Sequence, residues 1–196
     1  MTYIIIGIII AGGLIFYLTS CTSKKQLSIQ KSTDHTEEEK TKVQENPYSG
    51  FRNQSLSVTP DQLELKLDNN STIAYGIIMD WDIGKAVATV VTFQTGDASL
   101  YISAGQIHIG GFAHENIKSA ALTFINEGQN YLAKANLTTE TPMPDKGCIR
   151  FYFLTNKGKY FIQETVENIQ SEKSDLTKLF NLGNRVITEY RMLESK

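Results

Sequence analysis

The chain has 196 residues, a formal net charge of −2, 41% hydrophobic residues and 20% charged residues. These values are typical of a globular protein, and the absence of a basic excess argues against a nucleic-acid partner. Cys21 and Cys148 are too few for a disulfide framework, and Cys148 is expected to be a small buried residue.

The first 21 residues carry no charged side chain, and 4–18 is continuously apolar. A helix of about twenty residues, rising ~1.5 Å per residue, crosses a hydrocarbon layer of ~30 Å. One interpretation is a single-pass transmembrane helix with a cytoplasmic C-terminal domain, because Lys24 and Lys25 follow it directly. The other is a bacterial lipoprotein signal, because the sequence LTSC at 18–21 resembles a lipobox and would make Cys21 the lipidated residue. Both predict that residues 1–21 anchor the chain to a membrane.

The next segment, 22–46, is rich in Ser, Thr, Lys, Glu and Gln and has few large apolar residues. Such a composition cannot bury enough apolar surface to offset the entropy lost on ordering. We therefore predict a flexible linker at 22–46, followed by one globular domain at 47–196.

Within the domain, Thr59 as N-cap and Pro60 at the first helical position predict a short helix at 59–67. Apolar stripes at helical spacing predict a helix at 114–135 and a final helix from 174 onward. An extended pattern also resumes at 107–109. Alternation and β-branched residues predict five strands, at 73–81, 86–95, 99–103, 148–155 and 160–166.

This order of elements predicts an α+β domain with a five-stranded antiparallel sheet. The sheet would consist of a three-strand meander and, after a helix, a hairpin that leads to the C-terminal helix. The order is similar to that of profilin-like and roadblock or longin-type domains. Because 148–155 is apolar on both faces, we expect helices or a partner subunit to cover both sides of the sheet.

Three stretches resemble an uncharacterised family of bacterial proteins: YGIIMD at 75–80, FQTGDASLY at 93–101 and IRFYFLT at 149–155. The resemblance covers about residues 46–191. Where three consecutive glycines are expected in the family, this chain has Ala104, Gly105 and Gln106. The resemblance implies no activity.

The candidate ligand site is the segment from Gly105 to Gly111, which joins a strand to the start of a helix. Its backbone N–H groups, including that of Gly110, are suited to an anion, although a bulged strand end explains the same glycines. His108 and His114 flank the segment, and His114 is more simply a residue at the helix N-terminus.

Two charged residues within predicted strands complete the candidate site. With His108 and His114, Asp80 would form an acid–base or cation-binding cluster if the strand ends converge. Arg150 interrupts an apolar strand and is expected to pair with Asp80 across the sheet, or to anchor a ligand. No Cys-x-x-Cys or His-x-x-x-His spacing occurs, so the sequence predicts no metal site and no cofactor.

Two hypotheses follow. The first is a membrane-tethered, non-enzymatic interaction or scaffolding domain that forms homo-oligomers through its sheet or its final helix. The second is a small-ligand-binding domain or hydrolase that uses the Gly105–Gly111 segment with His108, His114 and Asp80.

Overall fold

The computed structural model describes residues 46–195. The predicted anchor at 1–21, with Cys21, and nearly all of the predicted linker lie outside these residues. Within 46–195, no helix combines the length and the apolar content that are needed to cross a membrane.

Seven strands form one antiparallel sheet in the order β4-β3-β2-β1-β6-β7-β5. The strands are β1 (Ala74–Asp82), β2 (Val87–Phe93), β3 (Ala98–Ile102), β4 (Ile107–Ile109), β5 (Asn136–Thr138), β6 (Cys148–Thr155) and β7 (Gly158–Thr165). The α-helices are α1 (Pro47–Leu56), α2 (Glu115–Gly128), α3 (Val166–Gln170) and α4 (Thr177–Glu194). Three short 3-10 helices are η1 (Asp61–Leu63), η2 (Gly111–Ala113) and η3 (Gln129–Lys134).

The predicted α+β class and antiparallel sheet are confirmed, but the prediction of five strands is wrong. The two additional strands, β4 and β5, have three residues each and lie at opposite edges of the sheet. They are strands because they pair with β3 and β7; 107–109 was predicted to be extended but not counted in the sheet, and the three residues of β5 are too few for a periodic signal in the sequence. The element order that suggested profilin and roadblock domains is therefore wrong as well.

The helices before the sheet also differ from the prediction. Residues 47–56 form α1, where Pro47 is the first helical residue and the Asn46 side chain accepts a hydrogen bond of 3.1 Å from Tyr48 N. The helix predicted at 59–67 is reduced to the single turn η1, and the left-handed backbone of Glu64, with a φ of 55°, follows its last residue. The weak amphipathic pattern of α1 explains why it was not predicted.

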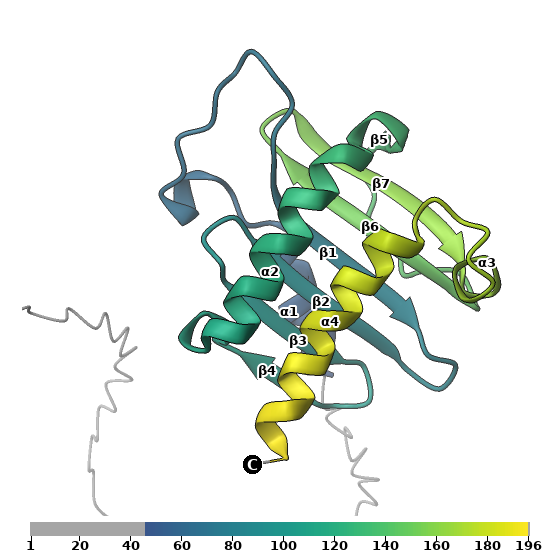
Figure 1. The fold of residues 1–196 in the computed structure, drawn as a ribbon. Helices are drawn as coiled ribbons and strands as arrows, with labels where there is room; N and C mark the ends of the chain where they lie inside the picture. The colour runs from purple at the N-terminus through teal and green to yellow at the C-terminus, as the bar shows by residue number, and fades with distance from the viewer. Residues whose placement is uncertain (1–45, 196) are drawn as a thin grey trace, which may run out of the picture. The chain divides into compact units, whose positions relative to one another are not determined.

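Both faces of the sheet are covered, as the apolar strands predict. Figure 1 shows α2 and α4 lying side by side across one face, with α1 behind the sheet. Ile77 and Met79 of β1 enter the core under α2 and α4, whereas Ile78 enters the second core with Tyr48 of α1. A register shift between Ala74 and Gly76 ends the regular alternation at the start of β1.

The close approach of α4 to β1 depends on Gly183. A Cβ atom at Gly183 would lie 2.6 Å from Met79 Sδ and 3.2 Å from Phe124 Cζ of α2. Both neighbours are fully buried, so a methyl group here must displace core atoms.

We predict that Gly183→Ala lowers the free energy of unfolding by about 1–2 kcal/mol, because overpacking outweighs the gain in helix propensity. Gly50→Ala in α1 is the matched control, because a Cβ there would meet nothing within 4 Å. This control should be neutral or stabilising. Urea denaturation of both variants measures the difference, and equal effects would contradict the packing argument.

Candidate functional site

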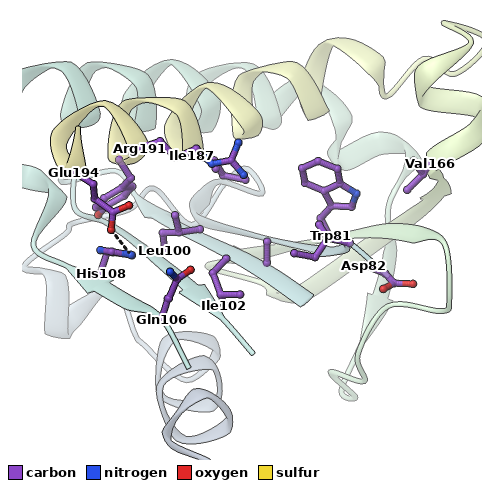
Figure 2. A pocket seen from close by; sticks show the side chains of 13 residues that line it. Trp81, Asp82, Leu100, Ile102, Gln106, His108, Val166, Ile187, Arg191 and Glu194 are labelled. Carbon is purple, nitrogen blue, oxygen red and sulfur yellow. Dashed lines mark ion pairs between the residues drawn. The ribbon is translucent and has the colours of Figure 1, made fainter. Parts of the chain in front are cut away.

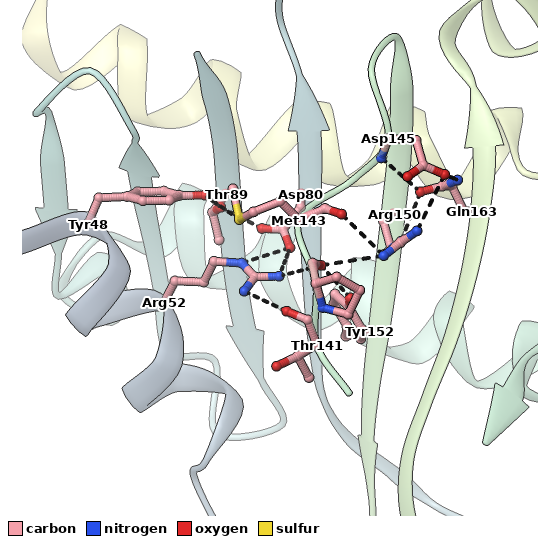
Figure 3. A network of polar contacts seen from close by, with 11 residues as sticks. Tyr48, Arg52, Asp80, Thr89, Thr141, Met143, Asp145, Arg150, Tyr152 and Gln163 are labelled. Carbon is pink, nitrogen blue, oxygen red and sulfur yellow. Dashed lines mark hydrogen bonds and ion pairs between the residues drawn. The ribbon is translucent and has the colours of Figure 1, made fainter. Parts of the chain in front are cut away.

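One candidate site is a buried polar network between α1 and the sheet (Figure 3). The Arg52 guanidinium donates to Asp80 Oδ2 from Nε at 3.0 Å and from Nη2 at 2.6 Å. It also donates to the backbone carbonyls of Thr141 and Pro142, at 2.9 and 3.1 Å. The Asp80 side chain is fully buried, so Arg52 compensates a charge that water cannot reach.

Tyr48 and Thr89 extend this network. Thr89 donates its only hydroxyl hydrogen to Asp80 Oδ1, so the 2.7 Å contact between the two hydroxyl groups requires Tyr48 to donate to Thr89. Burial, together with the negative charge of Asp80, raises the pKa of Tyr48 to about 12. Burial lowers the pKa of Arg52, but the hydrogen bonds that Arg52 donates to the Asp80 carboxylate outweigh this effect and raise the pKa above its ordinary value. The network is thus a closed set of satisfied partners, which is typical of a structural role.

The predicted pairing of Arg150 with Asp80 is not present. The two residues are cross-strand neighbours of β6 and β1, but the Arg150 side chain donates to Gln163 Oε1 at 2.8 Å and to the Met143 carbonyl at 3.2 Å. Arg150 also forms an ion pair with Asp145, in which Nη2 is 3.7 Å from Oδ2. Because Arg52 already neutralises Asp80, Arg150 instead holds the loop that precedes β6.

The Gly105–Gly111 segment is a turn, the strand β4 and the helix η2. Gly105 and Gly110 have φ values of 117° and 84°, which explains the use of glycine in these tight connections. Gly111 is buried against Ile117 and Tyr190. His114 lies at the N-terminus of α2 and makes no side-chain capping hydrogen bond.

The sheet register separates His108 from Asp80. Cross-strand pairs place Met79, Val90, Leu100 and His108 in one row that faces α2 and α4. The adjacent row runs through Asp80, Thr89, Tyr101 and Ile107 and faces α1. Neighbouring residues of a strand point to opposite faces, so the predicted cluster of Asp80 with the two histidines does not form.

The second candidate site is a cavity of about 440 Å³ between the C-terminal half of α4 and the sheet. Figure 2 shows Trp81 at one end and His108 at the other, with Leu100 and Ile102 on the floor between them. Trp81 is the only tryptophan in the chain, and its ring packs edge-on against Phe180 at 5.1 Å.

Six polar or charged side chains also line this cavity: Asp82, Gln106, His108, Tyr190, Arg191 and Glu194. His108 Nε2 is 3.2 Å from Glu194 Oε1 at one end, beside Gln106. Asp82 lies at the other end (Figure 2), where hydrogen bonds from Gly147 N and Gly84 N lower its pKa. Tyr190 donates to the Ala98 carbonyl at 2.7 Å, and burial raises the pKa of Tyr190 well above its ordinary value.

Of the predicted site residues, only His108 lines this cavity. Gly105, Gly110, Gly111 and His114 lie in the surrounding turns and helix ends, and Asp80 and Arg150 belong to the opposite side of the sheet. The sequence reasoning missed the contribution of α4, although Ile187, Tyr190, Arg191 and Glu194 fall at helical spacing and signal one lining face. The role of Arg52 in the buried network could not be predicted from such spacing, because the helix α1 itself was not predicted.

Comparison with known protein families, with curated proteins and with solved structures gives no match. The resemblance to an uncharacterised bacterial family therefore stays a prediction. Within residues 46–195, no group of three His, Cys, Asp or Glu side chains has an arrangement that would hold a metal ion.

We predict that Arg52→Met lowers the free energy of unfolding by about 3–5 kcal/mol, because Asp80 would remain charged and buried without a partner. Adding Asp80→Asn should restore part of this loss. The matched control is Arg185→Met, which removes the 3.8 Å ion pair between the exposed Arg185 and the largely buried Glu189 and should cost about 1 kcal/mol or less. Chemical denaturation measures all three, and similar losses for Arg52→Met and Arg185→Met would contradict this account.

Asp82 predicts a pH-dependent contribution to stability. Its pKa is lowered in the folded state, so its stabilisation is present above the ordinary aspartate pKa and is lost as the pH falls through the folded-state pKa. Asp82→Asn should therefore destabilise the protein by about 1 kcal/mol at neutral pH. The difference from the unmodified protein should shrink in denaturation experiments toward pH 3, and a pH-independent difference would disprove this role.

Proposed function

We propose that this chain is a membrane-tethered, non-catalytic domain that binds a small, mainly apolar molecule in the cavity beneath α4. The observation that carries the proposal is the cavity itself, because its volume of about 440 Å³ suits a small-molecule ligand. Its apolar floor would bury the body of such a ligand, and Gln106 with the His108–Glu194 pair would orient a polar group at one end.

The chemistry of the lining residues favours binding over catalysis. No serine, threonine, cysteine or lysine lines the cavity, so the side chains that most often act as activated nucleophiles are absent from its lining. Its carboxylates, Asp82 and Glu194, lie at opposite ends (Figure 2), which separates them too widely to act on one bond as an acid and base pair. The Tyr190 hydroxyl is already committed to a backbone carbonyl.

The membrane tether is part of the same proposal. It is supported by the uncharged segment 1–21, which in one interpretation spans the bilayer of a bacterial cell and in the other directs lipidation of Cys21. The homo-oligomeric scaffold has weaker support, because the described sheet is covered on both faces by its own helices.

The test of ligand binding uses the apolar dye N-phenyl-1-naphthylamine and the fluorescence of Trp81. We expect saturable dye binding with transfer of excitation from Trp81, because this ring lines the cavity. Ala88→Leu should weaken binding about tenfold or more, because the added atoms occupy the cavity. Ala88 is buried in its wall, so thermal unfolding must first show that the variant is folded.

Ala135→Leu is the matched control, because Ala135 packs against the same core but does not line the cavity. It should leave the dye affinity unchanged. Equal affinities of the two folded variants, or no saturable change in Trp81 emission, would contradict binding in this cavity.

A further inference from the structure

Three exposed apolar residues lie on the edge strand β4, on η2 that follows it and near the end of α4. Ile109, Phe112 and Met192 are 61%, 57% and 50% exposed. Ile109 shares a shallow groove with His114 and Leu193, and Met192 shares a second groove with the same two residues. Phe112 belongs to η2, directly between β4 and α2. We call Ile109, Phe112 and Met192 the β4-end patch.

The chain enters the described domain at this same end. Asn46, its first described residue, donates a hydrogen bond of 2.9 Å to the carbonyl of Ser103, in the turn between β3 and β4. The end of α4 is held nearby through the contact of Glu194 with His108 of β4. Asn46, where the described chain begins, therefore lies near the edge of the sheet that carries the β4-end patch.

We infer that the β4-end patch rests against the surface of a lipid bilayer. The inference depends on the membrane tether proposed above. Residues 22–45 span at most roughly 85 Å even when fully extended, so an anchored chain keeps the whole domain, and the patch with it, within reach of the bilayer. Tethering of this kind gives an effective concentration in roughly the millimolar range, so a small apolar contact suffices.

The charged residues around the patch indicate which lipid headgroups it should favour. Its two grooves contain Glu115, Glu189 and Glu194, whereas no lysine or arginine lines them. The patch therefore lacks the basic cluster that recognises anionic lipid. Phe112 and its aliphatic neighbours suit the interfacial region of a zwitterionic bilayer, and anionic lipid should weaken the contact.

The experiment uses the full-length chain in vesicles of phosphatidylcholine that is brominated on its acyl chains. Trp81→Phe removes the only tryptophan, and Phe112→Trp or Leu137→Trp then introduces a single reporter. Leu137 is the matched control, because it is 64% exposed but lies on β5, the opposite edge strand. We expect brominated lipid to quench about half of the emission of the Phe112→Trp chain and to leave the Leu137→Trp chain unchanged.

Two further measurements test whether the introduced tryptophan itself causes the contact with the bilayer. Ile109→Ser with Met192→Ser, in the Phe112→Trp chain, should reduce the quenching, and so should replacement of part of the phosphatidylcholine by phosphatidylserine. If neither the serine substitutions nor the added phosphatidylserine reduces the quenching, the inference is overturned.

Flotation of the vesicles on a density gradient distinguishes failure of the bilayer contact from failure of the membrane tether. Chains that float while the Phe112→Trp reporter stays unquenched would disprove the bilayer contact and leave the tether intact. Chains that do not float would overturn the tether and this inference together. Emission that shifts to the blue with protein density rather than with lipid would assign the patch to a second copy of the chain, and would also overturn the inference.

Discussion

The fold depends on β1 being the central strand of the sheet, buried on both faces and paired on both edges. Every residue from Ala74 to Asp80 is buried, so the Asp80 carboxylate must be neutralised by protein groups alone. Arg52 supplies that charge from α1, and its remaining donors hold the carbonyls of Thr141 and Pro142. One buried ion pair thus fixes α1 and the loop before β6 onto the same face, because losing either partner would leave a charge without water.

The alternation along β1 also determines where function is plausible. Asp80 points to the α1 face, where all of its neighbours are satisfied, whereas Trp81 points to the α4 face and lines the cavity. The register carries this division across β2 and β3 to His108 on β4. Alternate residues of each strand therefore belong to different sites: those that face α1 lie on the side of the structural network, and those that face α4 lie on the side of the cavity. Two residues that are adjacent in the chain consequently lie on opposite sides of the sheet.

Much of this architecture could be predicted from local patterns. The long strands and α2 have strong periodicity, because their apolar side chains alternate or form helical stripes over many residues. The edge strand β5 was not predicted, and 107–109, which forms β4, was predicted to be extended but not counted in the sheet, because strands of three residues depend on pairing with a neighbouring strand. The pairing of Asp80 was also mispredicted, since its choice of Arg52 over Arg150 depends on the position of α1, and no local pattern encodes that position.

The cavity follows from the way a straight helix crosses a twisted sheet. Near its start, α4 approaches β1 closely, and Gly183 permits this contact with Met79. Adjacent strands in a sheet are rotated by roughly 20–25°, so a helix that packs closely on one strand is not expected to follow every neighbouring strand equally closely. Tyr190 reaches across to the Ala98 carbonyl, and its long side chain supports the separation. The contact at Gly183 thus packs one part of α4 against β1, whereas a cavity lies beneath its C-terminal half, and the end of the helix lies beside His108 of β4.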